Sequence, residues 1–493
     1  MQTSFGVLNL VILSVYLLAM LAIGLWFMRR QESEEAYFLA SRAMPWLPVA
    51  MSMFASLTSA VTYIGLPARA YAENVSLIIV CLVSPLLVPI LALGFYPAYR
   101  RSGVTTSYEY IGRRYGPAAR TMVSGLFVLA RLGWMGTVIY APAMALAVAT
   151  GLPLGITIVL LGGMATAYTA LGGLAAVLWT DVVQFVILVA GAIWVAVSLT
   201  LQVDGGVSRI FQVAAEAGHL DIAGLRPSLF KMSALVVGVS FFLQMMQDYG
   251  TDQVTVQRML AIKQERGVLR ATLFNAATDF FMIALLLFIG LGLLAFYQVS
   301  PPATTVAADA VLPYYIVHYL PAGLSGLLIS AIFAAAMSSM DSGINSLTTV
   351  VVHDFIKPVR KGVTEGGTVL LARWITVGFG VLATALAFQV SRMENIVDAF
   401  ATFMGLFNAP VLALFLLGIF SPGSRFGAWC VSVPMAIAAT LYAKHGIGMH
   451  WVYFFPVGFV VSFGVAWGLG LVLGPPGGRG AARGRRRSEE AGV

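Results

Sequence analysis

Hydroxyl groups and one carboxylate follow a single stripe of an apolar segment near residue 340. The segment reads Ala335-Ala336-Met337-Ser338-Ser339-Met340-Asp341-Ser342-Gly343. At about 100° per residue, its three serines and Ala335 share one helical face about 100° wide, and Asp341 lies at the edge of that face. Such hard oxygen ligands suit a small hard cation better than zinc or copper. Serines that bond to their own helix and let neighbouring helices pack closely are the alternative.

Three further apolar runs contain polar residues. Residues 54–67 are rich in small and hydroxylated side chains and end in Gly65 and Pro67, whereas residues 247–253 hold two carboxylates and a glycine. Both compositions favour a helix that is interrupted within the membrane: the first could bind an ion through its free carbonyls, and the second would line a cavity. A close-packing face is the alternative for the first run. Residues 179–184 place Asp181 and an amide on one helical surface. For Asp279, a structural role and a functional role are equally compatible with its place in the sequence.

The composition decides which class of protein carries these residues. Hydrophobic residues make up 59% of the 493 residues and charged residues only 10%, whereas soluble chains carry about 25% charged residues. This indicates an all-α polytopic membrane protein and excludes collagen-like, disordered and disulfide-framed classes. The two cysteines lie in apolar runs, and the five histidines lack metal-ligand spacing.

A membrane-spanning helix needs about 20 apolar residues, and about thirteen segments qualify. They are 5–28, 46–71, 76–98, 120–149, 153–173, 175–201, 232–257, 268–298, 314–345, 367–391, 394–420, 425–443 and 450–474. The first segment lacks a basic stretch before it and a clear cleavage site, so we expect a retained helix rather than a signal peptide.

The distribution of the 29 basic residues orients these segments. If the N-terminus is outside and the C-terminus is cytoplasmic, the outer loops keep only Arg69, Arg209, Arg226, Lys231, Arg392 and Lys444. Arg131 lies within a span, and the others, Arg258 among them, are assigned to cytoplasmic loops, as the positive-inside rule requires. The net charge of +8 therefore indicates contact with membrane lipid and no nucleic acid. The Gly/Arg-rich residues 476–493 are expected to form a solvated cytoplasmic tail.

Three motifs resemble those of the sodium:solute symporter family. They are Gly172-Gly173-Leu174-Ala175-Ala176 followed by Trp179-Thr180-Asp181-Val182-Val183-Gln184, then residues 251–258, and then residues 338–346. The resemblance extends over about residues 5–470. Residues 333–336, 67–71 and 416–420 look most similar to the sialic-acid transporter branch.

This resemblance implies a LeuT-type fold of two inverted five-helix repeats within one transporter domain, residues 1–475. The repeats would be 46–201 and 232–420, with one extra helix (5–28) before them and two helices (425–474) after them. The interrupted segments would open the two repeats at the bilayer midplane.

The resemblance also implies ligands for Na⁺, the expected cofactor. The first sodium would bind the carbonyls of Ala55, Thr58 and Ala335 and the hydroxyls of Ser338 and Ser339. A second sodium would bind Asp181, Ser338, Asp341 and Ser342. The sialic-acid branch has serine where Asp341 stands, so this extra carboxylate could tighten the second site or take a proton instead.

Solute groups, by the same resemblance, would come from Ser59, Thr62, Tyr63, Trp134, Gln247 and Asp248. Here the chain departs from the sialic-acid branch, which has arginine at Trp134, glutamine at Cys81 and threonine at Leu57. Without that arginine a carboxylated sugar loses its charge partner, unless Arg131 substitutes. The Asp248 carboxylate favours a hydroxyl-rich or cationic solute, and pairing with another protein group or protonation is the alternative.

We therefore expect a monomeric symporter in the cell membrane that couples sodium entry to import of a small organic solute, such as a sugar, a polyol or an amino acid. Proton-coupled or facilitative transport is the nearest alternative, and a transporter-derived sensor is a remote one. The sequence has neither the His-Glu-x-x-His nor the Gly-x-Ser-x-Gly pattern, so no enzyme is expected.

Overall fold

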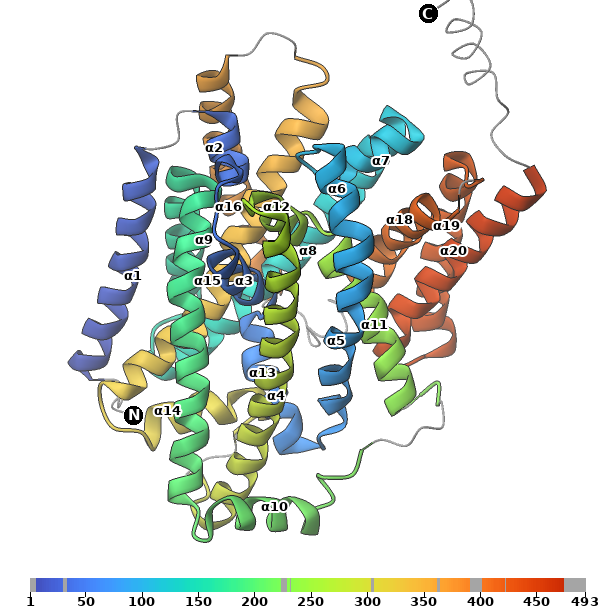
Figure 1. The fold of residues 1–493 in the computed structure, drawn as a ribbon. Helices are drawn as coiled ribbons and strands as arrows, with labels where there is room; N and C mark the ends of the chain where they lie inside the picture. The colour runs from blue at the N-terminus through green and yellow to red at the C-terminus, as the bar shows by residue number, and fades with distance from the viewer. Residues whose placement is uncertain are drawn as a thin grey trace, which may run out of the picture.

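The computed structural model describes residues 6–29, 33–222, 228–230, 232–302, 306–360, 364–390, 401–421 and 423–473, and nearly all of them lie in helices. The chain folds into a bundle of long helices that run in roughly the same direction (Figure 1). Its N-terminal half contains α1 (Val7–Met28), α2 (Glu34–Leu39), η1 (Ala40–Arg42), α3 (Trp46–Leu57), α4 (Ala60–Ala72), η2 (Ser76–Ile79), α5 (Val80–Ile90), η3 (Leu91–Phe95), α6 (Tyr96–Ser102), α7 (Ser107–Tyr115), α8 (Pro117–Thr150), α9 (Leu154–Gln202) and α10 (Gly206–Glu216).

The C-terminal half continues the bundle. It contains α11 (Ala234–Gly250), α12 (Gln253–Ala261), α13 (Glu265–Val299), η4 (Ala308–Ala310), α14 (Val311–His318), α15 (Leu324–Val350), η5 (Val351–Ile356), α16 (Glu365–Val390), η6 (Met404–Asn408), α18 (Ala409–Phe420), α19 (Phe426–Tyr442), η7 (Ala443–Ile447), η8 (Trp451–Tyr453) and α20 (Phe454–Leu473). The expected span 394–420 is described only from residue 401, and the expected tail lies outside the described residues.

Ten of the described helices are long and apolar enough to cross a membrane, or eleven if α3 and α4 together form one bent span. Two of the expected spans, 153–173 and 175–201, fall within α9, whose backbone turns at Gly173 with φ 57° and ψ −161°. Glycine tolerates this left-handed conformation because it has no Cβ. The expected span 232–257 is divided between α11 and α12.

The expected limits 314–345 are wrong at both ends. Residues 311–318 form the separate helix α14, and the long helix α15 begins only at Leu324 and runs on through η5 to Ile356. The chain turns between them because Pro321 lacks an amide hydrogen and Gly323 adopts φ 89°. The Ser325 hydroxyl ties the turn together by donating to the carbonyl of Ile316 at 2.7 Å.

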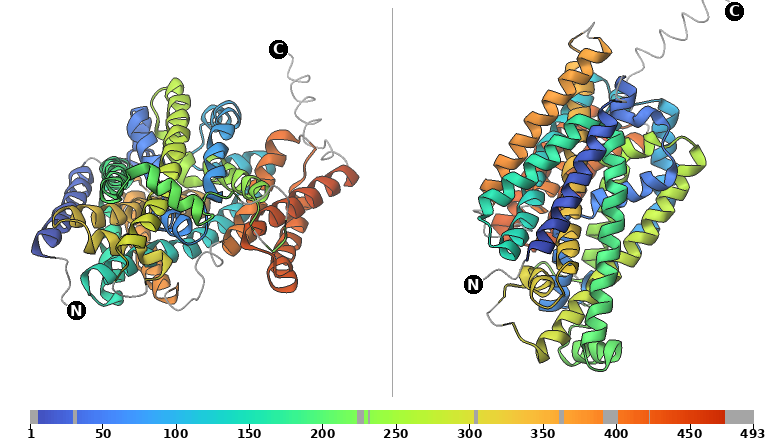
Figure 2. Two further views of the ribbon diagram at one scale, coloured as in Figure 1. Left: turned by 90° about the horizontal axis from the view of Figure 1, so that it is seen from below. Right: turned by 90° about the vertical axis from the view of Figure 1, so that its left-hand side faces the viewer.

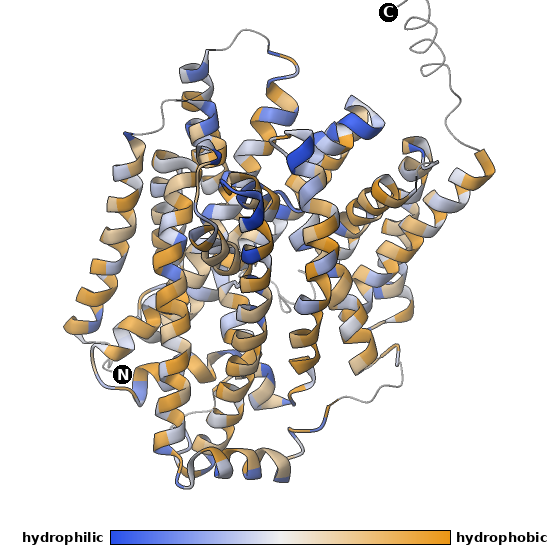
Figure 3. Cartoon of the chain, in the orientation of Figure 1, coloured by the Kyte–Doolittle hydropathy of each residue, from blue (hydrophilic) through white to orange (hydrophobic). Residues whose placement is uncertain are grey.

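Burial differs strongly across the bundle. α15 lies at its centre, with 94% of its apolar window buried, whereas the corresponding share is 22% for α1 and α20, which lie at opposite edges (Figures 1 and 2). The connecting helices α2, α6 and α7 gather at the upper end of the bundle, where hydrophilic residues concentrate (Figure 3). The central, buried helix is therefore the one that carries the serine and aspartate stripe.

Candidate functional site

The first interrupted helix breaks between α3 and α4, which meet at an angle of 60°. Thr58 leaves the helical conformation at φ −84° and ψ 85°, and the Ser59 hydroxyl caps α4 by accepting from the Thr62 amide at 3.4 Å. The Thr58 carbonyl accepts no hydrogen bond from any residue that the structure describes. The break therefore presents a free backbone oxygen inside the protein, as a cation site requires.

Three of the five groups expected for the first sodium are in contact where α15 crosses this break, and a fourth, the Ser339 hydroxyl, contacts the neighbouring Ser56 carbonyl. The Ser338 hydroxyl donates to the Ala55 carbonyl at 2.8 Å and lies 3.3 Å from the Ala335 carbonyl. The Ser339 hydroxyl donates to the carbonyl of Ser56 at 2.9 Å. Both serines are buried. Backbone carbonyls and hydroxyls thus converge in a dry, oxygen-rich setting, and this donor set fits Na⁺.

Asp181 on α9 lies in a buried hydrogen-bond network that reaches α3 through Ser52 and Ser56. Its Oδ2 accepts from the Ser52 hydroxyl at 2.5 Å and from the Ser56 hydroxyl at 3.2 Å. The Arg258 guanidinium is 3.0 Å from the same oxygen and donates through Nε to Ser52 at 2.8 Å. Oδ1 of Asp181 has no partner among the described residues.

Arg258 corrects one expectation, because it was assigned to a cytoplasmic loop. The structure places it on α12 with 1% of its surface exposed. Its side chain is the basic partner of Asp181, and it also contacts the Ser342 hydroxyl. From the sequence alone, an arginine at the end of a polar motif cannot be distinguished from a loop residue, because the sequence does not show that other helices cover α12.

Asp341 completes the cluster from α15. Its carboxylate accepts from the Tyr168 hydroxyl at 2.6 Å and from the Ser342 hydroxyl at 3.0 Å. Ser342 is in turn 2.8 Å from the Ser56 hydroxyl. Ser56 therefore links the two expected sodium groups, since its carbonyl faces Ser339 and its hydroxyl faces Asp181 and Ser342. Neither Ser56 nor Tyr168 was expected as a site residue.

The second interrupted helix breaks at Thr251 and Asp252, between α11 and α12. The Asp252 carboxylate caps α12 by accepting from the Val254 amide at 2.9 Å, and it forms a buried ion pair with Arg131. The Arg131 guanidinium also lies over the Trp134 ring, 4.6 Å from its centroid. The charge of Arg131 is thus already neutralised by the protein, and one face of the Trp134 indole is covered.

The six expected solute residues lie around these breaks on α4, α8 and α11, and no hydrogen bond joins two of these side chains in the described parts of the chain. The Tyr63 hydroxyl turns toward α9, 3.4 Å from the Leu188 carbonyl, and Gln247 accepts from Asn408 at 3.2 Å. Asp248 is half-buried and makes no hydrogen bond or ion pair with the described residues, and the charges that act on it are those of Asp252 and Arg131.

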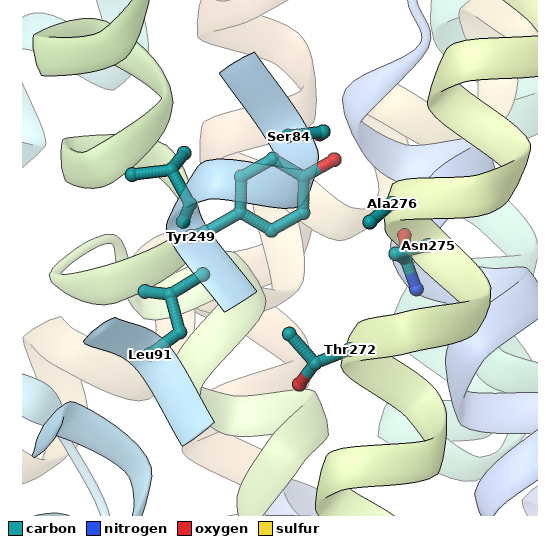
Figure 4. A pocket seen from close by; sticks show the side chains of 7 residues that line it. Ser84, Leu91, Tyr249, Thr272, Asn275 and Ala276 are labelled. Carbon is teal, nitrogen blue, oxygen red and sulfur yellow. The ribbon is translucent and has the colours of Figure 1, made fainter. Parts of the chain in front are cut away.

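Asp279 belongs to a separate structural contact. The hydroxyls of Ser84 and Tyr249 donate to its Oδ2 at 2.6 and 2.5 Å. Beside them lies a cavity of about 10 Å³ lined by Ser84, Tyr249, Thr272 and Asn275 (Figure 4), which is room for about one water molecule. Tyr249 directly precedes the second break, so this contact fixes α11 against α5 and α13.

Comparison with known proteins places this arrangement in a family. The model of the sodium:solute symporter family matches residues 37–428. The chain belongs to the sodium:solute symporter family. It is similar to the sodium/sialic acid symporter NanT of Aliivibrio fischeri, with 30% identity over 92% of this chain and 91% of the relative. It is also 31% identical to the sodium-dependent multivitamin transporter of Oryctolagus cuniculus, over 97% of this chain and 74% of that protein.

Solved structures agree with this membership. A Na⁺-coupled sialic acid symporter in a substrate-bound outward-open state matches with a TM-score of 0.89 and 28% identity, over 96% of this chain and 99% of that one. A nucleobase-cation-symport-1 family transporter matches with a TM-score of 0.56 and 15% identity, over 89% of this chain and 95% of that one, and this match shows the fold alone. The expected all-helical, LeuT-type fold is confirmed, whereas the count of thirteen spans and the orientation of the termini stay predictions. The protein is a multi-pass membrane transporter with Na⁺ as its coupling ion and is not an enzyme, as its relatives also indicate.

We expect Arg258→Met to destabilise the symporter strongly. Removing one partner of a buried ion pair leaves a buried charge and costs about 3–5 kcal/mol. The free energy of unfolding, followed by titration of the purified protein with a denaturing detergent, measures the effect. Arg113→Ala is the matched control, because its pair with Glu109 is exposed and such pairs contribute about 1 kcal/mol or less.

The double variant Asp181→Asn/Arg258→Met separates charge from shape. It removes both charges, so we expect it to recover most of the stability that Arg258→Met loses. Equal instability of the single and double variants would contradict the role of Arg258 as the counter-charge of Asp181.

Proposed function

We propose that this chain is a sodium-coupled symporter that imports a small organic solute by alternating access. The observation that carries the proposal is the 2.8 Å contact between the Ser338 hydroxyl and the Ala55 carbonyl across the break between α3 and α4. It brings two expected sodium ligands together from segments almost three hundred residues apart. Residues 46–201 and 232–420 would be the two repeats that move against each other during the cycle.

Sodium entry supplies enough free energy for such coupling. One charge moving through 100 mV is worth about 2.3 kcal/mol, and a tenfold sodium gradient adds about 1.4 kcal/mol. One ion then supports accumulation of a neutral solute by roughly 500-fold. The proposed ligands of this ion are the carbonyls of Ala55, Thr58 and Ala335 and the hydroxyls of Ser338 and Ser339.

The charge balance of the neighbouring cluster supports a second cation. Two buried carboxylates, Asp181 and Asp341, face one guanidinium, that of Arg258. If both acids are ionised, one negative charge is left in a dry environment, where an uncompensated charge is costly. We infer that a second Na⁺ neutralises it at Asp181, Ser338, Asp341 and Ser342. A proton on Asp341 is the alternative, and it would make transport partly proton-coupled.

The solute is proposed to bind between the two breaks, at Ser59, Thr62, Tyr63, Trp134, Gln247 and Asp248. Arg131 is paired with Asp252, so it offers no free charge to a carboxylate on the solute. Asp248, by contrast, has no ion-pair partner in the described part of the chain. These two observations favour a hydroxyl-rich or cationic solute over the sialic acid that the relatives' names specify.

Ser338→Ala should weaken sodium binding by about 10- to 100-fold, because the loss of one oxygen that interacts with an ion corresponds to about 1.5–3 kcal/mol. Binding of radioactive sodium to the purified protein measures the half-saturating concentration. Ser330→Ala is the matched control: Ser330 is a buried serine on the same helix, but its hydroxyl donates to the Gly326 carbonyl at 2.8 Å. Equal affinities in the two variants would remove Ser338 from the site.

Asp341→Ser should lower the number of sodium ions bound from two to one, because it removes the charge that attracts the second ion. Sodium binding at saturation and the Hill coefficient measure the change at fixed pH. An unchanged number of sodium ions and an unchanged half-saturation would contradict the second sodium site. A wild type that binds one sodium and releases a proton on binding would favour Asp341 as a proton carrier.

Uptake of a solute panel into proteoliposomes tests the function and the solute class together. We expect an inward sodium gradient to drive uptake of a neutral hydroxylated or a cationic solute and not of a carboxylated sugar. Asp248→Asn should raise the half-saturating concentration of that solute at least tenfold, since it loses a charge-assisted hydrogen bond. Uptake that is unchanged when potassium replaces sodium would overturn sodium coupling.

A further inference from the structure

A second crevice opens at the arginine-rich end of the bundle, and none of its lining residues belongs to either helix break. It has a volume of about 280 Å³ and lies between the η3–α6 segment and the start of α13. Its lining residues are Ala92, Pro97, Arg100, Arg101, Glu265, Arg266, Val268 and Leu269. The positive-inside rule places this end of the protein in the cytoplasmic leaflet.

Three guanidinium groups line the crevice and one carboxylate opposes them. Arg100 is held in place, because its Nη1 donates to the carbonyls of Met259 and Ile262 at 3.2 and 2.9 Å. Arg101 and Arg266 are exposed and form no hydrogen bond or ion pair with the residues that the structure describes. With Glu265 as the one acid in the lining, the crevice keeps a net positive charge that an anion can neutralise.

Exposed apolar side chains lie on the segments that form the crevice, and Leu269 lines it. Leu93 is 79% exposed, and Leu269 and Leu273 on α13 are 47% and 52% exposed. Such side chains belong in hydrocarbon, so the guanidinium groups lie where the apolar core of the bilayer meets its headgroups. A free phosphate ion would use the charges but leave this apolar surface without a partner, whereas a lipid uses both.

We propose that this crevice binds the phosphodiester headgroup of an anionic membrane lipid. Arg101 and Arg266 contact the headgroup, and the acyl chains pack along Leu93, Leu269 and Leu273. Basic pockets between spanning helices on the cytoplasmic side favour such lipids, because each arginine near the surface strengthens binding several-fold. Arg100 connects the crevice to the end of α12, so the lipid braces the half-helix that carries Arg258.

The experiment uses the full-length protein in mild detergent, with phosphatidylglycerol as the anionic probe and phosphatidylcholine as the zwitterionic one. Native mass spectrometry counts the lipids retained by each variant. We expect wild type to retain phosphatidylglycerol preferentially and Arg101→Ala/Arg266→Ala to bind it about tenfold more weakly or worse. The matched control is Arg29→Ala/Arg360→Ala, which removes two exposed arginines outside the crevice. Arg101→Lys/Arg266→Lys keeps both charges and should retain most of the binding.

Each result either supports or overturns the proposal. Loss of phosphatidylglycerol in the alanine variant alone, with its unfolding temperature in lipid-free detergent unchanged, supports the crevice. Equal loss in both alanine variants would show only a general attraction of anions to the basic end, and this overturns it. Displacement of phosphatidylglycerol from wild type by millimolar inorganic phosphate would overturn the lipid assignment in favour of a free anion.

Discussion

Backbone groups inside a bilayer have no water to bind, so a helix can break there only where other protein groups surround the break. Both breaks meet this constraint locally, because Ser59 caps α4 and Asp252 caps α12. The most buried of the candidate membrane spans, α15, then lies across the first break and supplies the hydroxyls of Ser338 and Ser339. The same exclusion of water that makes a break costly also gathers the oxygens that a dehydrated sodium ion needs.

The second condition that the structure must meet is the pairing of its buried charges, because an unpaired buried charge is costly. Asp252 and Arg131 form a neutral pair beside the second break. Arg258 pairs directly with Asp181, and the Ser342 hydroxyl, which contacts the same guanidinium, links it to Asp341. Arg258 is therefore as much a part of the proposed ion-binding region as the serines, because it sets how much positive charge the cluster still needs. Ser56 connects this cluster to the serines proposed for the first sodium, because its hydroxyl contacts Ser342 and its carbonyl accepts from Ser339.

The arrangement of the helices and the residues proposed to bind the solute are constrained to different degrees in this symporter. A sialic acid symporter with 28% identity matches the fold with a TM-score of 0.89, so the arrangement of the helices tolerates extensive substitution. The proposed solute groups are less constrained, because no hydrogen bond joins the side chains of Trp134, Gln247 and Asp248 in the described residues. We therefore expect a change of solute to require few substitutions, whereas a change of the proposed ion-binding region would disturb buried charges.

The sequence by itself determined the membrane class, the family resemblance, the interrupted segments near residues 58 and 251, and the serine stripe of residues 338–342. These features depend on composition and spacing within single segments, which are local. It misplaced the start of α15 and the position of Arg258, because a short apolar helix and a covered half-helix differ from their alternatives only through their neighbours. The pairs Arg131–Asp252 and Arg258–Asp181 are separated by 121 and 77 residues. Only the packing of distant helices could decide which buried charge meets which, because Coulomb attraction and desolvation depend on distance in space and not along the chain.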